Sequence, residues 1–191
     1  SPHISGNIVV WTDRRSGDDD IYGCNISSGK EFLICNNSAE QPGAIIAGDL
    51  VVWMDNRSGN LDIYGLNLSS SKEFPICAAQ GNQYPKAILG NIVVWNDYRN
   101  GSATYEKADI YGYNSSSGKE FPIRTNLTGL LITVASGDTV YWTESAHGIC
   151  YGYNLSSGAE FSIKNIPSTQ MIMAVSRNTL ILADDRDLVL F

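Results

Sequence analysis

Short apolar runs, each closed by Gly, Asn, Asp or Ser, follow one another along the whole chain. The runs PKAIL, NIVVWND, DIYGYN and KEFPI, for example, lie in succession within residues 85–123. Runs of this length between turn residues are typical of β-strands. They are continuously apolar rather than alternating, which indicates sheets that are covered on both faces. The pattern therefore predicts an all-β chain of small, covered sheets.

These runs recur as a four-strand unit. The segment NIVVWTDRRSGDDDIYGCNISSGKEFLI returns as DLVVWMDNRSGNLDIYGLNLSSSKEFPI, as NIVVWNDYRNGSATYEKADIYGYNSSSGKEFPI and, more distantly, as DTVYWTESAHGICYGYNLSSGAEFSI. Trp11, Trp53, Trp95 and Trp142 mark the copies at intervals of 42, 42 and 47 residues, whereas the fifth copy, NTLILADDRDLVLF, has no Trp. Repeated four-strand units predict a β-propeller of about five four-stranded antiparallel blades, the last one incomplete. A solenoid is the alternative, although its repeats are usually shorter.

We expect one propeller domain over residues 1–191. Its repeats lie at approximately 1–35, 36–77, 78–124, 125–164 and 165–191. Because the last repeat matches only part of a blade, several arrangements stay open: a fragment of a larger ring, a ring closed by three strands in the final blade or by one terminus completing the other's blade, and open strand edges through which chains self-associate.

The copies also predict the register of the central hairpin in each blade. If Asp55 faces Asp62, then Trp53 faces Tyr64, and the same alignment pairs Trp with Tyr in the other copies. Aromatic cross-strand pairs of this kind stabilise a sheet. A glycine that recurs on the second strand of the hairpin indicates space for a neighbouring side chain or blade. It is found at Gly23, Gly65, Gly112 and Gly152.

An acidic and basic motif, Asp-x-Arg-x-Gly followed by Asp-Ile-Tyr, occupies the first three hairpins. Its charged residues are Asp13, Arg15 and Asp20, then Asp55, Arg57 and Asp62, then Asp97, Arg99 and Asp109. In the predicted register the two Asp of a hairpin face each other, so their repulsion favours an Arg fork between them. We interpret the motif as a structural cluster, because a catalytic group is needed once rather than in every blade.

Calcium is the alternative partner for these hairpins, since clustered Asp and loop carbonyls are hard oxygen ligands. The run Asp18, Asp19 and Asp20 makes the first hairpin its best candidate. The neighbouring arginines would oppose a bound cation, and the spacing is not that of an EF-hand loop. We therefore expect no metal, with calcium at this run as the alternative.

Histidine and cysteine give no sign of another cofactor. The two histidines, His3 and His147, are too few for a metal centre built on several His ligands. The four cysteines lack zinc-site spacing; they are Cys24, Cys35, Cys77 and Cys150. Cys35 and Cys77 stand at equivalent points of successive repeats, which does not favour a disulfide between them.

The KEF segment of each repeat is expected to serve packing. Its phenylalanines, at 32, 74, 121 and 161, are predicted to pack between blades. Its glutamates are predicted to be solvated edge residues that discourage pairing between sheets; they are Glu31, Glu73, Glu120 and Glu160.

The enlarged loop of the third hairpin is the candidate binding site, because loops on a rigid scaffold often carry binding functions. Its candidate residues are Tyr98, Tyr105, Glu106 and Lys107. The alternative function is an enzyme acting on a carbohydrate or polyanion through carboxylates on the propeller rim or in its channel. Unrepeated acids, Glu144 and Asp184, are its candidates.

Charge and composition exclude some partners. The net charge of −7 argues against nucleic acid, which needs clustered Lys or Arg. No apolar run approaches the roughly 20 residues needed to span a bilayer. Eight Asn-x-Ser/Thr sequons agree with an exported protein, although four of them are copies of one hairpin turn.

The segment DNRSGNLDIYGLNL with a following KEFPI resembles the repeat of TolB-like propellers. The repeat sequence is also similar to tandem repeats of archaeal cell-surface, surface-layer type proteins. The resemblance covers nearly the whole chain. It implies four-stranded blades and an extracellular, surface-associated setting, without a specific ligand. We therefore expect a non-catalytic cell-surface or secreted module for protein or glycan interaction or scaffolding. The fourth copy departs from the repeat, since Glu144 replaces Asp and the Arg is missing.

Overall fold

The computed structural model describes residues 1–101, 108–127, 131–144, 149–163, 171–176, 179–183 and 188–190. Within these ranges the first sheet contains β1 (His3–Ser5), β2 (Ile8–Asp13), β3 (Asp20–Asn25) and β4 (Lys30–Cys35). The second contains β5 (Ile45–Ala47), β6 (Leu50–Asp55), β7 (Asp62–Asn67) and β8 (Lys72–Cys77). The third contains β9 (Gln83–Leu89), β10 (Ile92–Asp97), β11 (Asp109–Asn114) and β12 (Lys119–Arg124). The fourth contains β13 (Leu131–Ser136), β14 (Thr139–Glu144), β15 (Ile149–Asn154) and β16 (Glu160–Ile163), and the fifth contains β17 (Met171–Ser176), β18 (Thr179–Ala183) and β19 (Leu188–Leu190).

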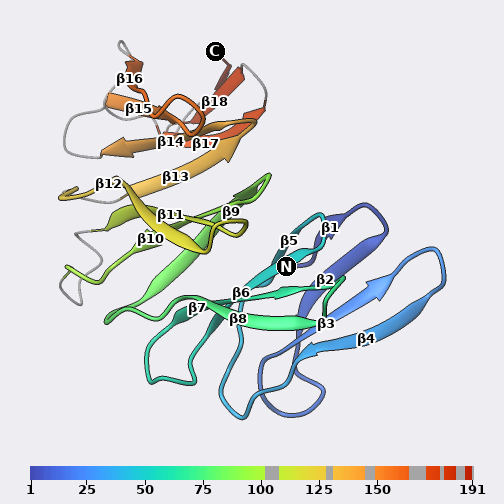
Figure 1. The fold of residues 1–191 in the computed structure, drawn as a ribbon. Helices are drawn as coiled ribbons and strands as arrows, with labels where there is room; N and C mark the ends of the chain where they lie inside the picture. Colours follow the sequence, from blue (N-terminus) through green and yellow to red (C-terminus); the bar gives the residue numbers. More distant parts are fainter. Residues whose placement is uncertain are drawn as a thin grey trace.

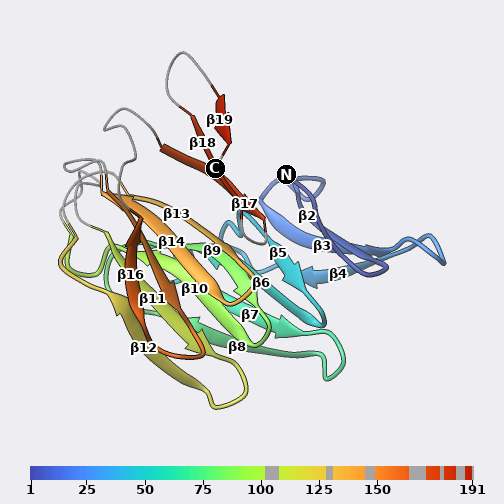
Figure 2. The same ribbon diagram turned by 90° about the horizontal axis from the view of Figure 1, so that it is seen from above.

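Each sheet is an antiparallel meander in which strands adjacent in sequence pair with each other. The first strands of successive sheets contact one another, β1 with β5, β5 with β9, β9 with β13 and β13 with β17. The sheets therefore follow one another around a common axis in chain order, as Figures 1 and 2 show. This arrangement confirms the predicted all-β propeller of four-stranded blades, and we number the blades one to five.

The hydrophobic core lies between the blades. Val51 and Val52 are neighbours on β6, so their side chains point to opposite faces of the sheet, and both are fully buried. Val51 packs in the cluster shared with blade one, and Val52 packs in the cluster shared with blade three. The expectation of two covered faces is confirmed, and it explains why the strands are continuously apolar.

Each tryptophan after the first packs against the preceding blade. Trp53 lies in the cluster with residues of blade one, Trp95 in the cluster with blade two, and Trp142 in the cluster with blade three; all three are fully buried. The prediction that each Trp faces a Tyr across the hairpin is confirmed. Trp53 pairs with Tyr64 in the strand register, and the Trp of each other copy pairs with the equivalent Tyr. The recurring Trp therefore joins the two strands of its hairpin and the two blades at an interface.

The Asn-x-Ser-Ser turns have a local cause. The Oδ1 atom of Asn25 accepts hydrogen bonds from the backbone N–H groups of Ser27 (3.1 Å) and Ser28 (3.2 Å), and the other three turns repeat this use of Asn. The geometry of the turn alone therefore favours Asn and Ser at these positions. In the described part of the chain, no helix has the length and apolar character needed to cross a membrane.

Candidate functional site

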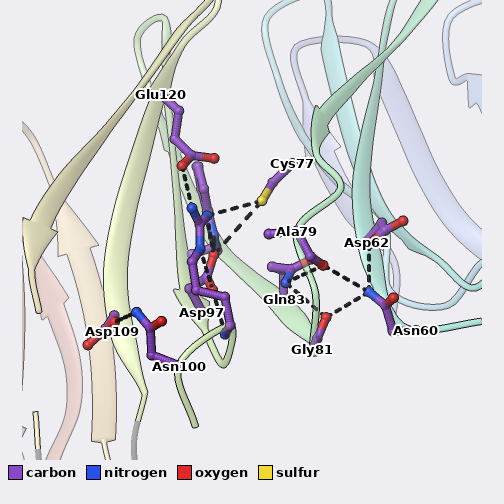
Figure 3. Close-up of polar contacts among 12 residues, drawn as sticks. Asn60, Asp62, Cys77, Ala79, Gly81, Gln83, Asp97, Asn100, Asp109 and Glu120 are labelled. Atoms are coloured by element: carbon purple, nitrogen blue, oxygen red, sulfur yellow. Dashed lines mark hydrogen bonds and ion pairs between the residues drawn. The ribbon is translucent and has the colours of Figure 1, made fainter. Parts of the chain in front are cut away.

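The charged residues of the third hairpin form a closed network around Asp97. One carboxylate oxygen, Oδ1, accepts hydrogen bonds from the backbone N–H of Arg99 (2.8 Å) and from its Nε (2.9 Å). The other, Oδ2, accepts from Arg99 Nη2 and from Trp95 Nε1, both at 2.7 Å. Arg99 Nη1 then reaches Glu120 on β12 at 2.7 Å (Figure 3). We call such a set of Trp, Asp, Arg and Glu a hairpin cluster.

The same hairpin cluster stands in blades one and two. Its members are Trp11, Asp13, Arg15 and Glu31 in blade one, and Trp53, Asp55, Arg57 and Glu73 in blade two. In all three blades the guanidinium also lies over the ring of the tyrosine on the neighbouring strand, 4.0 to 4.4 Å from its centroid. One Arg thus joins three strands by a bidentate ion pair, a cation–π contact and a second ion pair.

One sequence expectation about this motif is wrong, and one about the neighbouring glutamates is incomplete. The Arg does not lie between the two Asp of the hairpin, because it stacks on the tyrosine and extends toward the outer strand instead. The second Asp has its own partners: Asp62, for instance, accepts from Ser58 Oγ at 2.5 Å and from Asn60 Nδ2 at 2.6 Å. The glutamates of the KEF segment are not merely solvated, since the first three pair with these arginines.

The remaining second Asp residues follow the same rule with local donors. Asp20 accepts from Ser16 Oγ at 2.5 Å. Asp109 accepts from Asn100 Nδ2 at 3.1 Å and from the backbone N–H of Asn126 at 2.7 Å. Neutral donors from the hairpin itself or from the next loop therefore stabilise the second Asp, a role that the sequence pattern suggested for Arg.

Blade four lacks the hairpin cluster, and its surroundings change accordingly. Among the described residues, the buried indole Nε1 of Trp142 has no hydrogen-bond partner, whereas the other three tryptophans donate to an Asp. Glu160 pairs instead with Arg124, whose Nη1 lies 3.5 Å from Glu160 Oε2. Arg124 holds the repeat position in blade three that Cys35 and Cys77 hold in blades one and two. A cation from the preceding blade thus replaces the missing hairpin Arg as the partner of this Glu.

The thiols of the first two blades contact the next hairpin cluster. Arg57 Nη2 lies 3.7 Å from Cys35 Sγ, and Arg99 Nη2 lies 3.3 Å from Cys77 Sγ, which is also 3.9 Å from Asp97 Oδ2 (Figure 3). Both cysteines are buried and free. The hairpin clusters of blades two and three therefore contact the preceding blade as well as joining the strands of their own.

Burial protects three of the four thiols from reaction. It raises the pKa of Cys35 to about 11 and the pKa values of Cys77 and Cys150 to about 12, so little thiolate forms near neutral pH. We expect the native protein to release one equivalent of thionitrobenzoate rapidly from Ellman's reagent, from the half-buried Cys24, and the other three only on unfolding. Cys24→Ser should abolish the fast phase, and rapid reaction of two or more native thiols would contradict this assignment.

The hairpin cluster of blade one predicts a dependence of stability on acid pH. Hydrogen bonds from Arg15 and then Trp11 hold the pKa of the Asp13 carboxyl well below its ordinary value of 3.8. A pKa that folding depresses contributes stability above the unfolded-state pKa and loses it as the pH falls toward the folded-state pKa. We expect the free energy of unfolding to fall between roughly pH 5 and pH 2, and Asp13→Asn to weaken that dependence. Urea unfolding at several pH values measures it, and identical slopes in both proteins would count against it.

A part of the predicted binding loop can be described. Tyr98 contacts Tyr84 edge to face, with ring centroids 5.6 Å apart. Tyr105, Glu106 and Lys107 lie outside the described residues, so their role stays a prediction. Asp184 and the side chain of Glu144, which the enzyme alternative requires, also lie outside the described part.

Two grooves between blades were not foreseen from the sequence. One, of about 550 Å³, lies between blades two and three, and the other, of about 400 Å³, lies between blades one and two. Equivalent repeat positions line both: Phe74 and Pro75 in the larger groove correspond to Phe32 and Leu33 in the smaller. The facing blade contributes Tyr113, Ser115 and Ser116 to the larger groove, and Leu66, Leu68 and Ser69 to the smaller.

The sequence matches no protein-family model and no curated protein, whereas its fold is found in many solved structures. TolB from Acinetobacter baumannii is similar at 14% identity and a TM-score of 0.63, over 95% of this chain and 50% of that one. The β-propeller domain of the Trilobed protease from Pyrococcus furiosus is similar at 11% identity and a TM-score of 0.70, over 100% of this chain and 69% of that one. A chain in a structure of the Nidogen/Laminin complex is similar at 13% identity and a TM-score of 0.60, over 100% of this chain and 74% of that one.

At these identities the comparisons show the fold alone. The chain has a TolB-like β-propeller fold and spans half the length of the TolB chain that it resembles. In the described ranges, no group of three or more His, Cys, Asp or Glu side chains is placed to hold a metal ion.

Proposed function

We propose that this propeller is a non-catalytic interaction module that acts outside the cell, at the surface or after secretion, and binds a protein or glycan. The repeated grooves between the blades are the observation that carries this proposal. They present half-exposed aromatic and apolar side chains beside hydroxyl and amide groups, a combination suited to a partner with both apolar and polar faces. The sequons and the resemblance to archaeal surface-layer type repeats support the extracellular setting.

The fate of the acidic residues supports a non-catalytic function. Asp13, Asp55 and Asp97 have both carboxylate oxygens bonded to Arg and Trp. A carboxylate held in this way is not free to transfer a proton or attack a substrate, because its lone pairs are already engaged. The prominent acids of the repeat therefore serve the blades rather than a substrate.

The larger groove favours a glycan. The rings of Phe74 and Tyr113 lie 6.3 Å apart at 31° and form a curved aromatic surface beside Lys72, Asn67 and Ser116. An aromatic surface can pack against the apolar face of a sugar ring, while amide, hydroxyl and ammonium groups hydrogen-bond its hydroxyls. The smaller groove, with three leucines, is better suited to an apolar peptide segment.

A glycan array and a pull-down from cell-surface extract test the proposal. We expect a captured partner whose binding Tyr113→Ala and Lys72→Ala weaken at least about tenfold, if the side chains contribute about 1.4 kcal/mol or more. Lys30→Ala is the matched control, since Lys30 holds the same repeat position in blade one and lines neither groove. Turnover of a substrate without any captured partner would overturn the proposal. Mass measurement in solution tests the separate prediction of self-association through strand edges.

A further inference from the structure

The sheet of blade one has a face that is turned away from blade two. Val9 and Trp11 are two residues apart on β2, so their side chains lie on the same face. Ile4 on β1 and Cys24 on β3 stand directly opposite Val9 in the register, which places them on that face as well. Ile26 follows Cys24 by two residues and completes a set that we call the open face. Blade one carries it at one end of the array of blades (Figure 1).

The same positions in the other blades pack against the preceding blade. In blade two they lie in or against the cluster shared with blade one, and they are Ile46, Val51, Trp53, Leu66 and Leu68. The equivalent Val and Trp of blades three and four are fully buried in the same way, at Val93, Trp95, Val140 and Trp142. Each of these faces is therefore covered by a blade of the same repeat.

In blade one the same positions are uncovered. Ile4 is 62% exposed and Ile26 is 52% exposed, the two highest values among the large apolar side chains of the described ranges. Val9, Trp11 and Cys24 are half-buried. A contiguous group of exposed apolar side chains marks an interaction site on a soluble protein. The open face thus has the sequence of a blade interface without the cover that the other blades have.

The hairpin cluster of blade one shows the same loss of cover. The side chain of Arg15 is 50% exposed, whereas those of Arg57 and Arg99 are 23% and 22% exposed. Arg57 and Arg99 each contact a buried cysteine of the preceding blade. Since the contacts within the three clusters are alike, the difference in exposure comes from the neighbouring blade. A partner on the open face would cover Arg15 as well.

The shape of the array decides what can cover the open face. The fifth blade of the same chain leaves it uncovered, because the exposed fractions of Ile4 and Ile26 are those in its presence. The five blades match 69% of the Trilobed protease propeller, so less than a third of such a ring stays open. A second copy that continued the array would need space for five more blades and would meet blade five. A copy related by a two-fold axis avoids this collision, because it sets open face on open face and directs its own blades away.

We propose that two copies of this chain pack open face on open face and form a symmetric dimer. The face suits this contact because its centre is apolar, and Arg15 at its margin is already paired with Asp13 and Glu31. Two sheets that pack face to face bury the side chains of both inner surfaces, as in a β-sandwich. The contact is made by the side chains of a sheet face, which distinguishes it from pairing through strand edges.

Sedimentation equilibrium of the full chain over a wide range of protein concentration tests the proposal. We expect a monomer in dilute solution and a dimer in concentrated solution without larger species, since an isologous contact occupies the face of both copies in one step. A monomer at every concentration would overturn the proposal, and so would an average mass that keeps rising beyond two copies.

Charged substitutions locate the contact. Ile4→Asp and Ile26→Asp should each raise the dissociation constant of the dimer at least about tenfold, because a carboxylate would be buried without a partner. Both side chains are exposed in the monomer, so its thermal midpoint in dilute solution should change little. Phe161→Asp is the matched control, since Phe161 is exposed on blade four, away from the open face, and the dimer should form as before. Undiminished dimerisation in the first two variants, or an equal loss in all three, would contradict the assignment.

The thiol of Cys24 gives a second readout. Because Cys24 stands opposite Val9 within the open face, its rapid reaction with Ellman's reagent belongs to the monomer and should slow as the protein concentration rises. Ile4→Asp should keep the reaction fast in concentrated solution. A reaction that stays fast in a protein shown to be dimeric would place the contact on another surface and overturn the proposal.

Discussion

Asp97→Asn should lower the free energy of unfolding by about 3 kcal/mol, because removing one partner of a buried ion pair leaves the other uncompensated. Asp97 is fully buried as a side chain, while the Arg99 side chain is 22% exposed. The neutral amide can accept fewer of the four hydrogen bonds that converge on the carboxylate. Arg99 then loses its bidentate ion pair and keeps Glu120, the Tyr111 ring and the Cys77 thiol as neighbours. Urea unfolding followed by tryptophan fluorescence measures the loss.

Asp13→Asn is the matched control for this prediction. It removes the same carboxylate from the same motif, but Arg15 is 50% exposed, so water compensates for most of the lost attraction. We expect a clearly smaller loss than for Asp97→Asn, as for exposed ion pairs. Equal losses in the two variants would show that burial of the hairpin cluster does not set its contribution.

Gly112→Ala should destabilise the fold by about 1 to 3 kcal/mol through overpacking. A Cβ atom at Gly112 would lie 2.6 Å from Cζ of Phe121 and 2.9 Å from Cε2, closer than carbon atoms approach. The Phe121 ring is half-buried in the core between blades three and four, so it cannot move aside freely. Denaturant unfolding measures the cost.

Gly152→Ala provides the comparison at the same repeat position. Its Cβ would lie still closer to a ring, 2.3 Å from Cζ of Phe161, but Phe161 is 42% exposed and can rotate outward. We therefore expect a smaller loss than at Gly112. A larger loss at Gly152 would mean that contact distance rather than freedom to move decides the cost. Combining Gly112→Ala with Phe121→Leu should recover part of the lost stability.

The fold could be predicted from the sequence because the repeat shows its pattern four times. The pairing of Trp53 with Tyr64 and the burial of both Val51 and Val52 follow from strand geometry alone. The space at the recurring glycines could be anticipated for the same reason, and the cross-strand phenylalanine fills it. Local periodicity therefore suffices for the strand pairing and the burial pattern within one sheet.

The partners of the charged residues could not be predicted as well. Cross-strand repulsion between Asp55 and Asp62 suggested that Arg57 lies between them, but the stacking of Arg57 on Tyr64 and its reach to Glu73 direct it elsewhere. Rotamer choices of this kind depend on side chains two strands away. The contacts of Cys35 and the grooves depend on the angle between blades, about which a single repeat carries no information.

The hairpin arginines are fixed to the aspartates, and the structure of the hairpin clusters depends on this contact. Hydrogen exchange of the arginine Nε–H groups, followed by NMR, tests it directly, because Arg57 Nε and Arg99 Nε donate to Asp55 and Asp97 at 2.8 and 2.9 Å. We predict slow exchange at both, with Asp97→Asn accelerating exchange at Arg99 and leaving Arg57 unchanged. Exchange at the rate of free arginine in the unmodified protein would contradict the claim.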